Sequence, residues 1–425
     1  MKNEEVKKIL EKVDFIELGI VNVLGQLKTR TFLNKNVDEI LEYGFGFDGS
    51  SVGMARIEDS DLVALPDMST LRVFDAGGYI IGFMLCNVFK REKPFMADPR
   101  NLLKSFLEKY PYTSYLGPEI EFYIIRENKQ NGNYMDPYPV DVFKPLKREL
   151  LLKLDSLGFD VKLEHHEVGQ DQHEITIRYD NPLTMADKII FYKYFLRSFF
   201  KDKGFDITFM PKPFFGMAGN GMHCHISVWE NGKNLFENGT SLSEEGMSFI
   251  AGLMEHAQEM TLLTNFTVNS YKRLVPGYEA PCYVSWGFGN RSAMIRVPSY
   301  RNKVSTIELR SPDPLVNPYL AFLSILSAGL DGIEKGLKPS SPINFNLFKT
   351  PRVEDIEVLP STLEQAISNF IKGKLLKKVL GDVASSIVEL KKNEWDSYIS
   401  HLSQIEKPTD TLEITEWEKK MYFYM

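Results

Sequence analysis

Four short segments of the sequence alternate acidic, imidazole or guanidinium side chains with apolar ones. They are residues 117–125 (GPEIEFYII), 173–179 (HEITIRY), 221–229 (GMHCHISVW) and 305–311 (STIELRS). Side chains two positions apart on a β-strand point to the same face, so each segment predicts a strand with one charged and one apolar face. A single strand of this kind is explained by an ordinary sheet that has one face exposed to solvent. Four of them, carrying mostly Glu, His and Arg, predict a curved sheet around a charged cavity.

The rest of the chain predicts an α+β fold in two parts. Residues 15–24 and 26–32 are β-rich and meet at Gly25, which predicts a hairpin, and the glycine-dense residues 44–61 predict a long functional loop. Helical patterns cover residues 3–13, 37–43, 101–110, 182–201, 242–265, 317–334, 363–373 and 375–402. The aromatic C-terminus begins with a capping-box pattern, Thr415 to Glu418, and we expect it to be docked, on its own subunit or on another.

Residues 269–314 combine charge with many Gly and Pro residues. They hold Arg273, Arg291, Arg296, Arg301 and Arg310, with Glu279 and Glu308 between them. A planar guanidinium group is suited to bidentate binding of carboxylate or phosphate. A solvated basic loop accounts for any one of these arginines, but the whole set, interleaved with apolar residues, favours a site for a polyanion.

Composition narrows the class of protein. A net charge of -7 over 425 residues argues against nucleic acid as the main partner. Three widely spaced cysteines suggest neither a disulfide framework nor a thiolate zinc site, and they fit a reducing cytoplasm. The charged N-terminus lacks the apolar core of a signal peptide, and the apolar runs are too short to span a bilayer. We therefore expect a cytoplasmic protein that binds no membrane.

Three further segments, RLVPGYEAP, NRSAMIRVP and ELRSPDPLVNPYLAF, closely resemble signature segments of glutamine synthetase, in its type I bacterial and archaeal form. The resemblance covers nearly the whole chain. It implies a small β-grasp-like domain over residues 1–100 and a catalytic domain over residues 101–425, with a curved antiparallel sheet surrounded by helices and a C-terminal helical docking segment. It also implies ATP-dependent ligation of ammonia to L-glutamate through γ-glutamyl phosphate.

The chain offers a set of glutamates, Glu119, Glu121, Glu167, Glu174 and Glu308, with the single imidazole of His223. This set favours Mg²⁺ or Mn²⁺, because hard oxygen ligands suit these cations and a single His keeps Mn²⁺ competitive. The resemblance implies two or three ions in each active site. One would be held by Glu121, Glu167 and Glu174, and another by Glu119, His223 and Glu308.

The resemblance also assigns the residues that hold the substrates. For ATP they are His225, Ser227, Arg291, Arg296 and Lys303. For glutamate and ammonium they are Asp48, Ser51, Gly219, Arg273, Glu279, Arg291 and Arg310. Of these, Asp48, Glu279, Arg291 and Arg310 would be catalytic. Asp48 would reach the site from a neighbouring subunit and deprotonate ammonium, and Glu279 would close over the γ-glutamyl phosphate on a loop bounded by Gly and Pro.

The implied assembly is a dodecamer of two hexameric rings. Arg56 resembles the arginine through which the feedback-inhibited α subtype senses glutamine, and nitrogen-regulatory proteins are possible partners. The sequence departs from the family pattern at Ala218 and Thr306, and the task of the amide replaced by Ala218 could have passed to Asn220.

Three alternatives have a sequence rationale: a γ-glutamyl-amine ligase, a non-catalytic structural or regulatory relative, and a guanidino kinase. Retention of Asp48 and Glu279 argues against the first, because a site for bulkier amines has less use for an ammonium pocket. Retention of all six metal ligands argues against the second, because buried charges are costly without a use. The third gives no reason for the FDGSS loop around Asp48.

Overall fold

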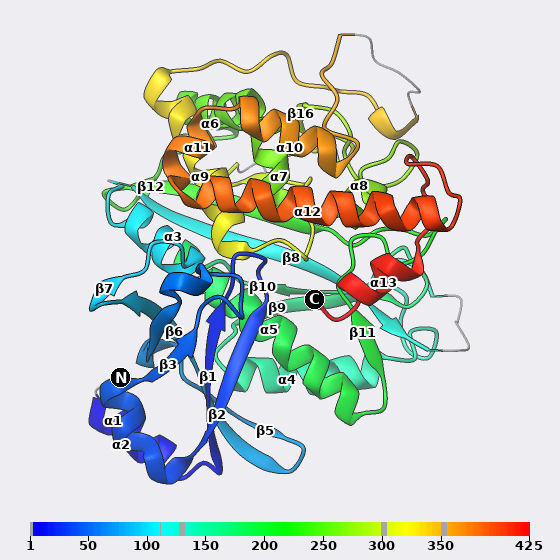
Figure 1. Ribbon diagram of the computed structural model, residues 1–425. Coiled ribbons are helices and arrows are strands. Elements are labelled where there is room, and N and C mark those ends of the chain that lie inside the picture. Colours follow the sequence, from blue (N-terminus) through cyan, green and yellow to red (C-terminus); the bar gives the residue numbers. More distant parts are fainter. Residues whose placement is uncertain (1–2, 111, 127–131, 299–303, 350–354) are drawn as a thin grey trace.

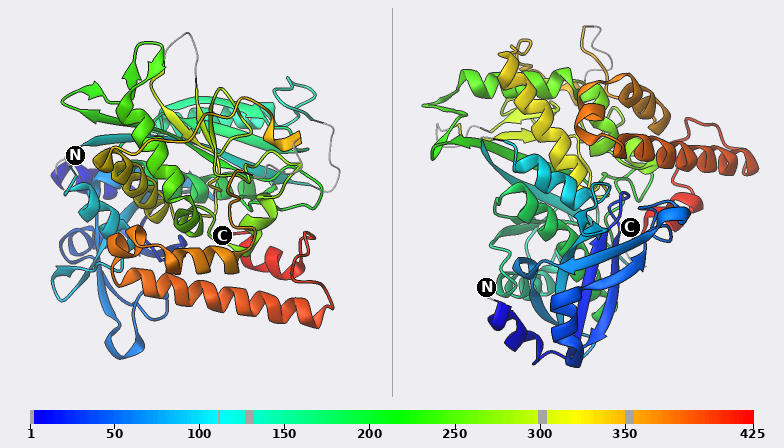
Figure 2. Two further views of the ribbon diagram at one scale, coloured as in Figure 1. Left: turned by 90° about the horizontal axis from the view of Figure 1, so that it is seen from above. Right: turned by 60° about the vertical axis from the view of Figure 1, so that its left-hand side comes forward.

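The computed structural model describes residues 3–110, 112–126, 132–298, 304–349 and 355–425 (Figure 1). Two sheets organise this part of the chain, one built from the first hundred residues and the other from the rest. Helices gather mainly around the second sheet, and Figure 2 shows the first sheet projecting to one side of that larger body.

The first sheet has seven strands in the order β2-β1-β6-β4-β3, with β5 and β7 also paired to β6. Its elements are α1 (Asn3–Leu10), β1 (Phe15–Val21), β2 (Leu27–Leu33), α2 (Val37–Tyr43), β3 (Phe45–Asp48), β4 (Asp61–Pro66), β5 (Arg72–Ala76), β6 (Tyr79–Lys90) and β7 (Lys93–Pro94). β1 and β2 form the predicted antiparallel hairpin, and β1 also runs parallel to β6.

The prediction of one loop over residues 44–61 is wrong at its ends. Residues 45–48 form β3, because Phe45 and Phe47 alternate with short or polar residues and pair with Ala64 and Leu62 of β4. The remaining loop, between β3 and β4, is interrupted by a short 3₁₀ turn at Ile57–Asp59.

The second sheet has nine strands in the order β16-β17-β18-β12-β8-β10-β9, with β11 beside β8 and β13 beside β12. Its strands are β8 (Thr113–Ile125), β9 (Val161–His166), β10 (Gln172–Ile177), β11 (Asp206–Thr208), β12 (Met222–Glu230), β13 (Lys233–Asn234), β16 (Trp286–Phe288), β17 (Ile295–Val297) and β18 (Ile307–Leu309). The four segments that alternate in sequence become β8, β10, β12 and β18. They are neighbours in the sheet and pair antiparallel, as predicted.

The apolar faces of these strands are covered by helices. Ile120 and Phe122 of β8 and Met222 of β12 are fully buried, and the Phe122 ring lies 5.9 Å from that of Phe200 on α5. The helices of this part are α3 (Pro99–Leu107), α4 (Lys144–Ser156), α5 (Pro182–Asp202), α6 (Glu244–Glu255), α7 (Ala257–Thr264), α8 (Val268–Arg273), α9 (Pro318–Lys335), α10 (Leu363–Lys372), α11 (Leu375–Leu380), α12 (Val383–Gln404) and α13 (Glu416–Tyr422). The polar faces are thereby left to line a cavity.

Two predicted helices are each divided in two. The pattern over residues 242–265 becomes α6 and α7, with His256 between them, and the pattern over residues 375–402 becomes α11 and α12. In the second case Gly381 adopts a positive φ of 57°, which ends α11. Within the described residues, no helix is both long and apolar enough to span a membrane.

The C-terminal segment docks on its own chain, one of the two arrangements that the sequence left open. Thr415 and Glu418 form the predicted capping box at the start of α13. The Tyr422 hydroxyl donates to Glu394 of α12 at 2.8 Å, and Thr208 of β11 donates to the Phe423 carbonyl at 3.0 Å. α13 therefore lies between α12 and β11 (Figure 1).

Candidate active site

A cavity of about 830 Å³ opens on the charged face of the second sheet, which confirms the predicted charged cavity. Of the residues predicted for metal and substrates, it is lined by Glu119, Glu121, Glu167, Glu174, Gly219, His223, His225, Arg273, Glu279, Arg291, Arg296 and Arg310. They come from four strands, the end of α8 and several loops, which are far apart in the sequence. The cavity thus brings acidic and basic groups together within one volume.

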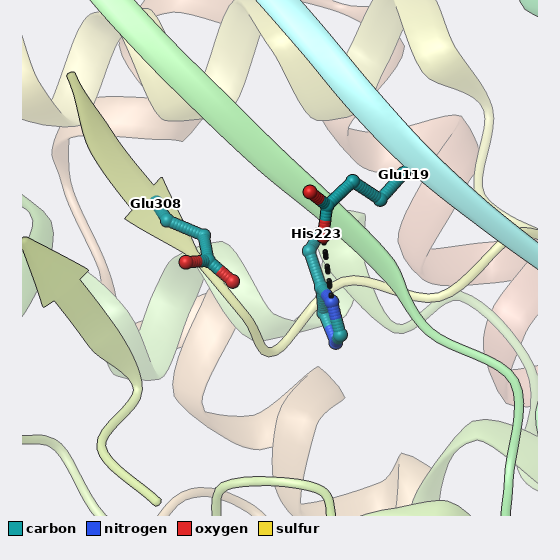
Figure 3. Close-up of side chains that lie close together, drawn as sticks. All are labelled: Glu119, His223 and Glu308. Atoms are coloured by element: carbon teal, nitrogen blue, oxygen red, sulfur yellow. Dashed lines mark ion pairs between the residues drawn. The ribbon is translucent and has the colours of Figure 1, made fainter. Parts of the chain in front are cut away.

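The first acidic group consists of Glu119, His223 and Glu308, one from each of β8, β12 and β18 (Figure 3). The strand register places His223 opposite Glu119, and Glu308 lies on the next strand, opposite His225. One ligand atom from each of the three lies within 4.8 Å of the others. Figure 3 shows the three side chains converging on one space from adjacent strands. Two carboxylates and one imidazole at this spacing fit a divalent cation.

The protonation of this group also favours a cation. Burial lowers the pKa of His223, so the ring is neutral and a nitrogen can act as ligand. Burial opposes ionisation of Glu119, but its contacts with His223 and His225 outweigh it and lower the pKa of Glu119. In the same way Arg310 and His225 overcome burial and lower the pKa of Glu308 to about 2. Both carboxylates are therefore ionised at neutral pH.

Two arginines that were predicted to hold the substrates contact Glu308. Arg310 Nη1 lies 2.5 Å from Glu308 Oε1, and Arg296 bonds the other oxygen. The Arg310 Nε also donates to the Arg291 carbonyl at 3.0 Å, which ties two of the predicted substrate ligands to one another. The basic groups are thus held next to the first acidic group, where a phosphate between them would meet both.

The second acidic group consists of His165, Glu167 and Glu174, whose ligand atoms also lie within 4.8 Å of one another. His165 Nε2 is 2.8 Å from Glu167 Oε1 and its Nδ1 is 4.0 Å from Glu174 Oε1. Sequence reasoning missed His165. The available signal was its position two residues before Glu167, at the end of β9, which predicts a shared face.

Glu121 was predicted as a ligand with Glu167 and Glu174. It pairs with Glu174 in the register of β8 and β10, and its Oε1 lies 3.9 Å from His223 Nε2. Among the described residues it joins neither group. Its Oε2 accepts hydrogen bonds from the Gly221 amide at 2.7 Å and from Gln172 Nε2 at 3.2 Å. Burial and the nearby Glu167 raise the pKa of Glu121 to about 8.

Glu174 is similarly perturbed, because burial and Glu119 raise its pKa well above the usual range. Five carboxylates thus surround one cavity, and two of them bind protons strongly in the absence of cations. Like charges at this density call for counter-cations, and oxygen-rich groups with one imidazole each fit Mg²⁺ or Mn²⁺.

Comparison with known proteins identifies the family of this site. The glutamine synthetase β-grasp domain matches residues 12–91 and the glutamine synthetase catalytic domain matches residues 96–409. The chain belongs to the glutamine synthetase family. Glutamine synthetase of Thermococcus kodakarensis is 42% identical, covering 97% of this chain and 96% of the relative. That of Pyrococcus furiosus is also 42% identical, with 99% of each chain covered.

Solved structures agree on the fold. Plasmodium falciparum glutamine synthetase superposes with a TM-score of 0.84 over 100% of this chain and 99% of its own, at 24% identity. A complex of GmaS with ADP gives 0.87 over 98% of both chains, at 29% identity. The α+β fold class, the family and the activity of a glutamate–ammonia ligase, all expected from the motifs, are confirmed.

At one end of the glutamine synthetase cavity lies Arg273, the last residue of α8. Its Nη1 donates to the Ser311 carbonyl at 2.7 Å and its Nη2 to the Arg310 carbonyl at 3.1 Å. A Cβ on Gly219 would come within 2.8 Å of Arg273 Cγ, so only glycine lets the chain approach so closely.

The amide that Ala218 replaces has not passed to Asn220. The Asn220 side chain is fully buried, donates to the Met210 carbonyl at 2.9 Å and accepts from Gln172 at 3.0 Å. It therefore supports the protein interior and leaves the cavity without a carboxamide from this segment. The Ala218 carbonyl accepts from the Tyr123 hydroxyl at 2.8 Å.

Several predicted residues lie elsewhere. Asp48 and Ser51 are exposed near β3, and neither is among the described residues that line the cavity. Ser50 and Ser51 hydroxyls donate to Asp48 at 2.7 and 2.5 Å and lower its pKa. Arg56 is exposed in the same loop. Ser227 is buried beside Trp229, whose indole donates to it at 2.9 Å, and Lys303 falls outside the described residues.

Proposed function

We propose that this cavity joins ammonia to L-glutamate at the cost of ATP, through γ-glutamyl phosphate, giving glutamine, ADP and phosphate. The observation that carries the proposal is that four arginines and the two acidic groups gather at one cavity, which all of them line except Glu308, buried beside Arg296 and Arg310. Phosphoryl transfer needs positioning and charge neutralisation more than covalent help from the protein, and these groups supply both.

The acidic groups would hold two or three divalent cations, Mg²⁺ or Mn²⁺. Glu119, His223 and Glu308 would hold one, and Glu167 and Glu174, with His165 or Glu121, would hold another. Bound cations supply charge neutralisation at the phosphates of ATP and at the carboxylate that is phosphorylated.

The arginines and neighbouring polar groups would orient the substrates. Arg291 and Arg296, with His225, Ser227 and Lys303, would hold ATP. Arg310 now pairs with Glu308, and a phosphoryl group offers its guanidinium another anionic partner at the same place. Arg273, with the backbone at Gly219, would bind the α-carboxylate and amino group of glutamate.

The acid–base groups would act on ammonium. Asp48 is held ionised by its serine neighbours, which suits it to attract a cation and, with Ser51, to guide it to the acyl phosphate. Burial and Glu167 raise the pKa of Glu279, which makes that carboxylate a better proton acceptor. On its loop between Gly277 and Pro281, Glu279 would shield the acyl phosphate from water and take a proton as the amide forms.

Because Asp48 lies outside the cavity of its own chain, the proposal requires a neighbouring subunit to supply it. We propose a dodecamer of two six-membered rings in the cytoplasm, with regulation by glutamine at Arg56 or by a regulatory protein. Mixing Asp48→Ala with Arg310→Ala subunits tests the shared site: each variant alone is inactive, and reassembled mixtures regain roughly a quarter of the activity when neighbours complement each other. No recovery would place Asp48 and Arg310 on the same subunit's site.

The first experiment is phosphate release with ATP, Mg²⁺ and L-glutamate, comparing ammonium with methylamine and putrescine. A strong preference for ammonium is the expected result. Preference for an amine would favour the second candidate function, a γ-glutamyl-amine ligase. The observation behind this candidate is that Ala218 stands where the family has a residue with a carboxamide side chain. No turnover by a folded, cation-bound oligomer would favour a non-catalytic role.

A further inference from the structure

The C-terminal helix carries a carboxylate that is fully buried. Glu418 uses both of its oxygens: Oε1 accepts from Asn269 Nδ2 at 2.9 Å, and Oε2 lies 2.6 Å from Lys272 Nζ. The same Oε2 accepts from the Thr415 amide and hydroxyl, at 2.8 and 2.9 Å, in the capping box. The capping box explains only the bonds within α13. The bonds to Asn269 and Lys272 connect α13 to a different part of the chain.

That part is α8, a helix of six residues that ends at Arg273. A helix this short is not stable by itself, so its position depends on the contacts around it. Every residue of α8 is buried, and the Lys272 ammonium is held by Glu418 and by the Glu413 carbonyl at 2.6 Å. The chain that leads into α13 and α13 itself thus hold the residue directly before Arg273.

Asn269 extends the connection to a second segment of the chain, at Lys212. Its Oδ1 accepts from the Lys212 amide at 2.7 Å and its Nδ2 donates to the Lys212 carbonyl at 3.0 Å. The Lys212 ammonium lies 3.5 Å from the centroid of the Tyr278 ring, a close cation–π contact. Tyr278 directly precedes Glu279 and lines the cavity. One carboxylate therefore connects, through Asn269, to the loop that carries Glu279.

We propose that Glu418 is a positioning residue for the glutamate-binding end of the cavity: it fixes α8, and through α8 both Arg273 and the Tyr278–Glu279 loop. The inference rests on the proposed function, in which Arg273 binds the α-carboxylate of glutamate. The nucleotide end is built from β12, β17 and β18, whose residues do not contact Glu418 in the described part of the chain. Glu418 therefore affects one substrate and spares the other.

The test is the steady-state kinetics of Glu418→Gln in the assembled enzyme, with L-glutamate and ATP varied separately. The amide keeps the size of the side chain but removes the charge that pairs with Lys272. A shift of Arg273 by a fraction of an ångström is expected to raise the KM for glutamate about tenfold or more, while the KM for ATP changes less than about twofold. Lys272→Met breaks the same pair from the other side and is expected to give the same pattern.

The double variant Glu418→Gln with Lys272→Met is expected to raise the glutamate KM no further than either single change, because both remove one interaction. Glu259→Gln is the matched control. Glu259 is a buried carboxylate that pairs with His256 at 2.7 Å, and it is not among the described residues that line the cavity. It is expected to lower the melting temperature with both KM values unchanged.

Three results would overturn the proposal. The first is an unchanged glutamate KM in folded Glu418→Gln and Lys272→Met, and the second is an equal rise in the KM for glutamate and for ATP. The third is loss of folded protein in both variants while Glu259→Gln folds, which would make the contact purely structural. Failure of the proposed function itself is distinguishable, because the unmodified enzyme would then show no glutamate-dependent phosphate release.

Discussion

Divalent cations should bind this enzyme more weakly as the pH falls below 8, with release of protons. Burial and Glu167 raise the pKa of Glu121 to about 8, and burial and Glu119 raise that of Glu174. Without a cation these carboxyls retain protons at neutral pH. A cation that enters the cavity has to displace them, so protons and cations compete for the same oxygens.

The size of the effect follows from the number of protons displaced. One proton changes the cation affinity about tenfold per pH unit, or ~1.4 kcal/mol. Between pH 8 and pH 6, Glu121 alone accounts for about a hundredfold weakening, and displacement of a second proton from Glu174 makes the slope steeper. The contribution of Glu121 saturates above pH 8, where that carboxyl is ionised without a cation.

The stability of the cation-free protein depends on pH in the opposite direction: it decreases as the pH rises, whereas the cation affinity increases. A carboxyl with a raised folded-state pKa contributes stability that is complete below its unfolded pKa, near 4.3, and is lost as the pH rises through the folded value. For Glu121 that loss extends from about pH 4 to about pH 8. Added Mg²⁺ should therefore raise the melting temperature more at pH 8 than at pH 6.

Isothermal titration of Mn²⁺ into the nucleotide-free enzyme, at pH 6, 7 and 8 in buffers of different ionisation enthalpy, measures both affinity and protons released. Thermal unfolding with EDTA or with Mg²⁺ at the same pH values measures how much the cation raises the melting temperature. Glu121→Gln is the control: its amide still accepts from Gly221, and proton release at pH 7 should fall by about one. Proton release near zero at pH 6 and 7, with a pH-independent affinity, would refute the reasoning.

Three other substitutions have defined outcomes. Asp48→Ala should lower ammonium-dependent turnover about a hundredfold or more and leave the KM values for ATP and glutamate within about threefold; unchanged turnover would remove Asp48 from the mechanism. Arg100→Met, at the proposed boundary between the parts 1–100 and 101–425, leaves Asp67 and Asp187 without their 2.8 Å partner. It should cost about 3–5 kcal/mol in urea unfolding, and a loss below about 1 kcal/mol would contradict a buried pair. Lys212→Met removes the cation beneath Tyr278 and should release more phosphate than glutamine formed, as water enters; a ratio that stays at one would exclude this role.

The sequence contained enough information to predict the charged face of the second sheet, because alternation with period two depends only on local geometry. Glu119 and His223 are each marked by an apolar neighbour on either side, and the structure pairs them in register. What alternation does not contain is the hydrogen-bond partner that each side chain takes. Glu121 and Glu174 are paired in register on adjacent strands, yet Glu121 bonds Gly221 and is not a member of the group that Glu174 forms with His165 and Glu167.

His165 shows the complementary difficulty. Only a partner on another strand distinguishes a ligand from an ordinary polar residue at a strand end. That partner is Glu174, which pairs with His165 in the register of β9 and β10. The registers of paired strands are set by long-range contacts, which the sequence of β9 does not reveal.

Glu418 was hidden for a different reason, because a local motif already accounted for it. Its place three residues after Thr415 satisfies the capping box, and both reciprocal bonds of that box are present. Because the capping box already explains a glutamate at position 418, the sequence does not indicate that this residue has a second role. Yet Lys272 lies 146 residues away in the chain, and its buried ammonium needs an anion that the capping box alone would not demand. The local capping box thus determines the position of the Glu418 side chain, and the long-range pair with Lys272 requires that this side chain be charged. Substitution of Glu418 by Gln separates the two requirements, because the amide keeps the size of the side chain and removes its charge.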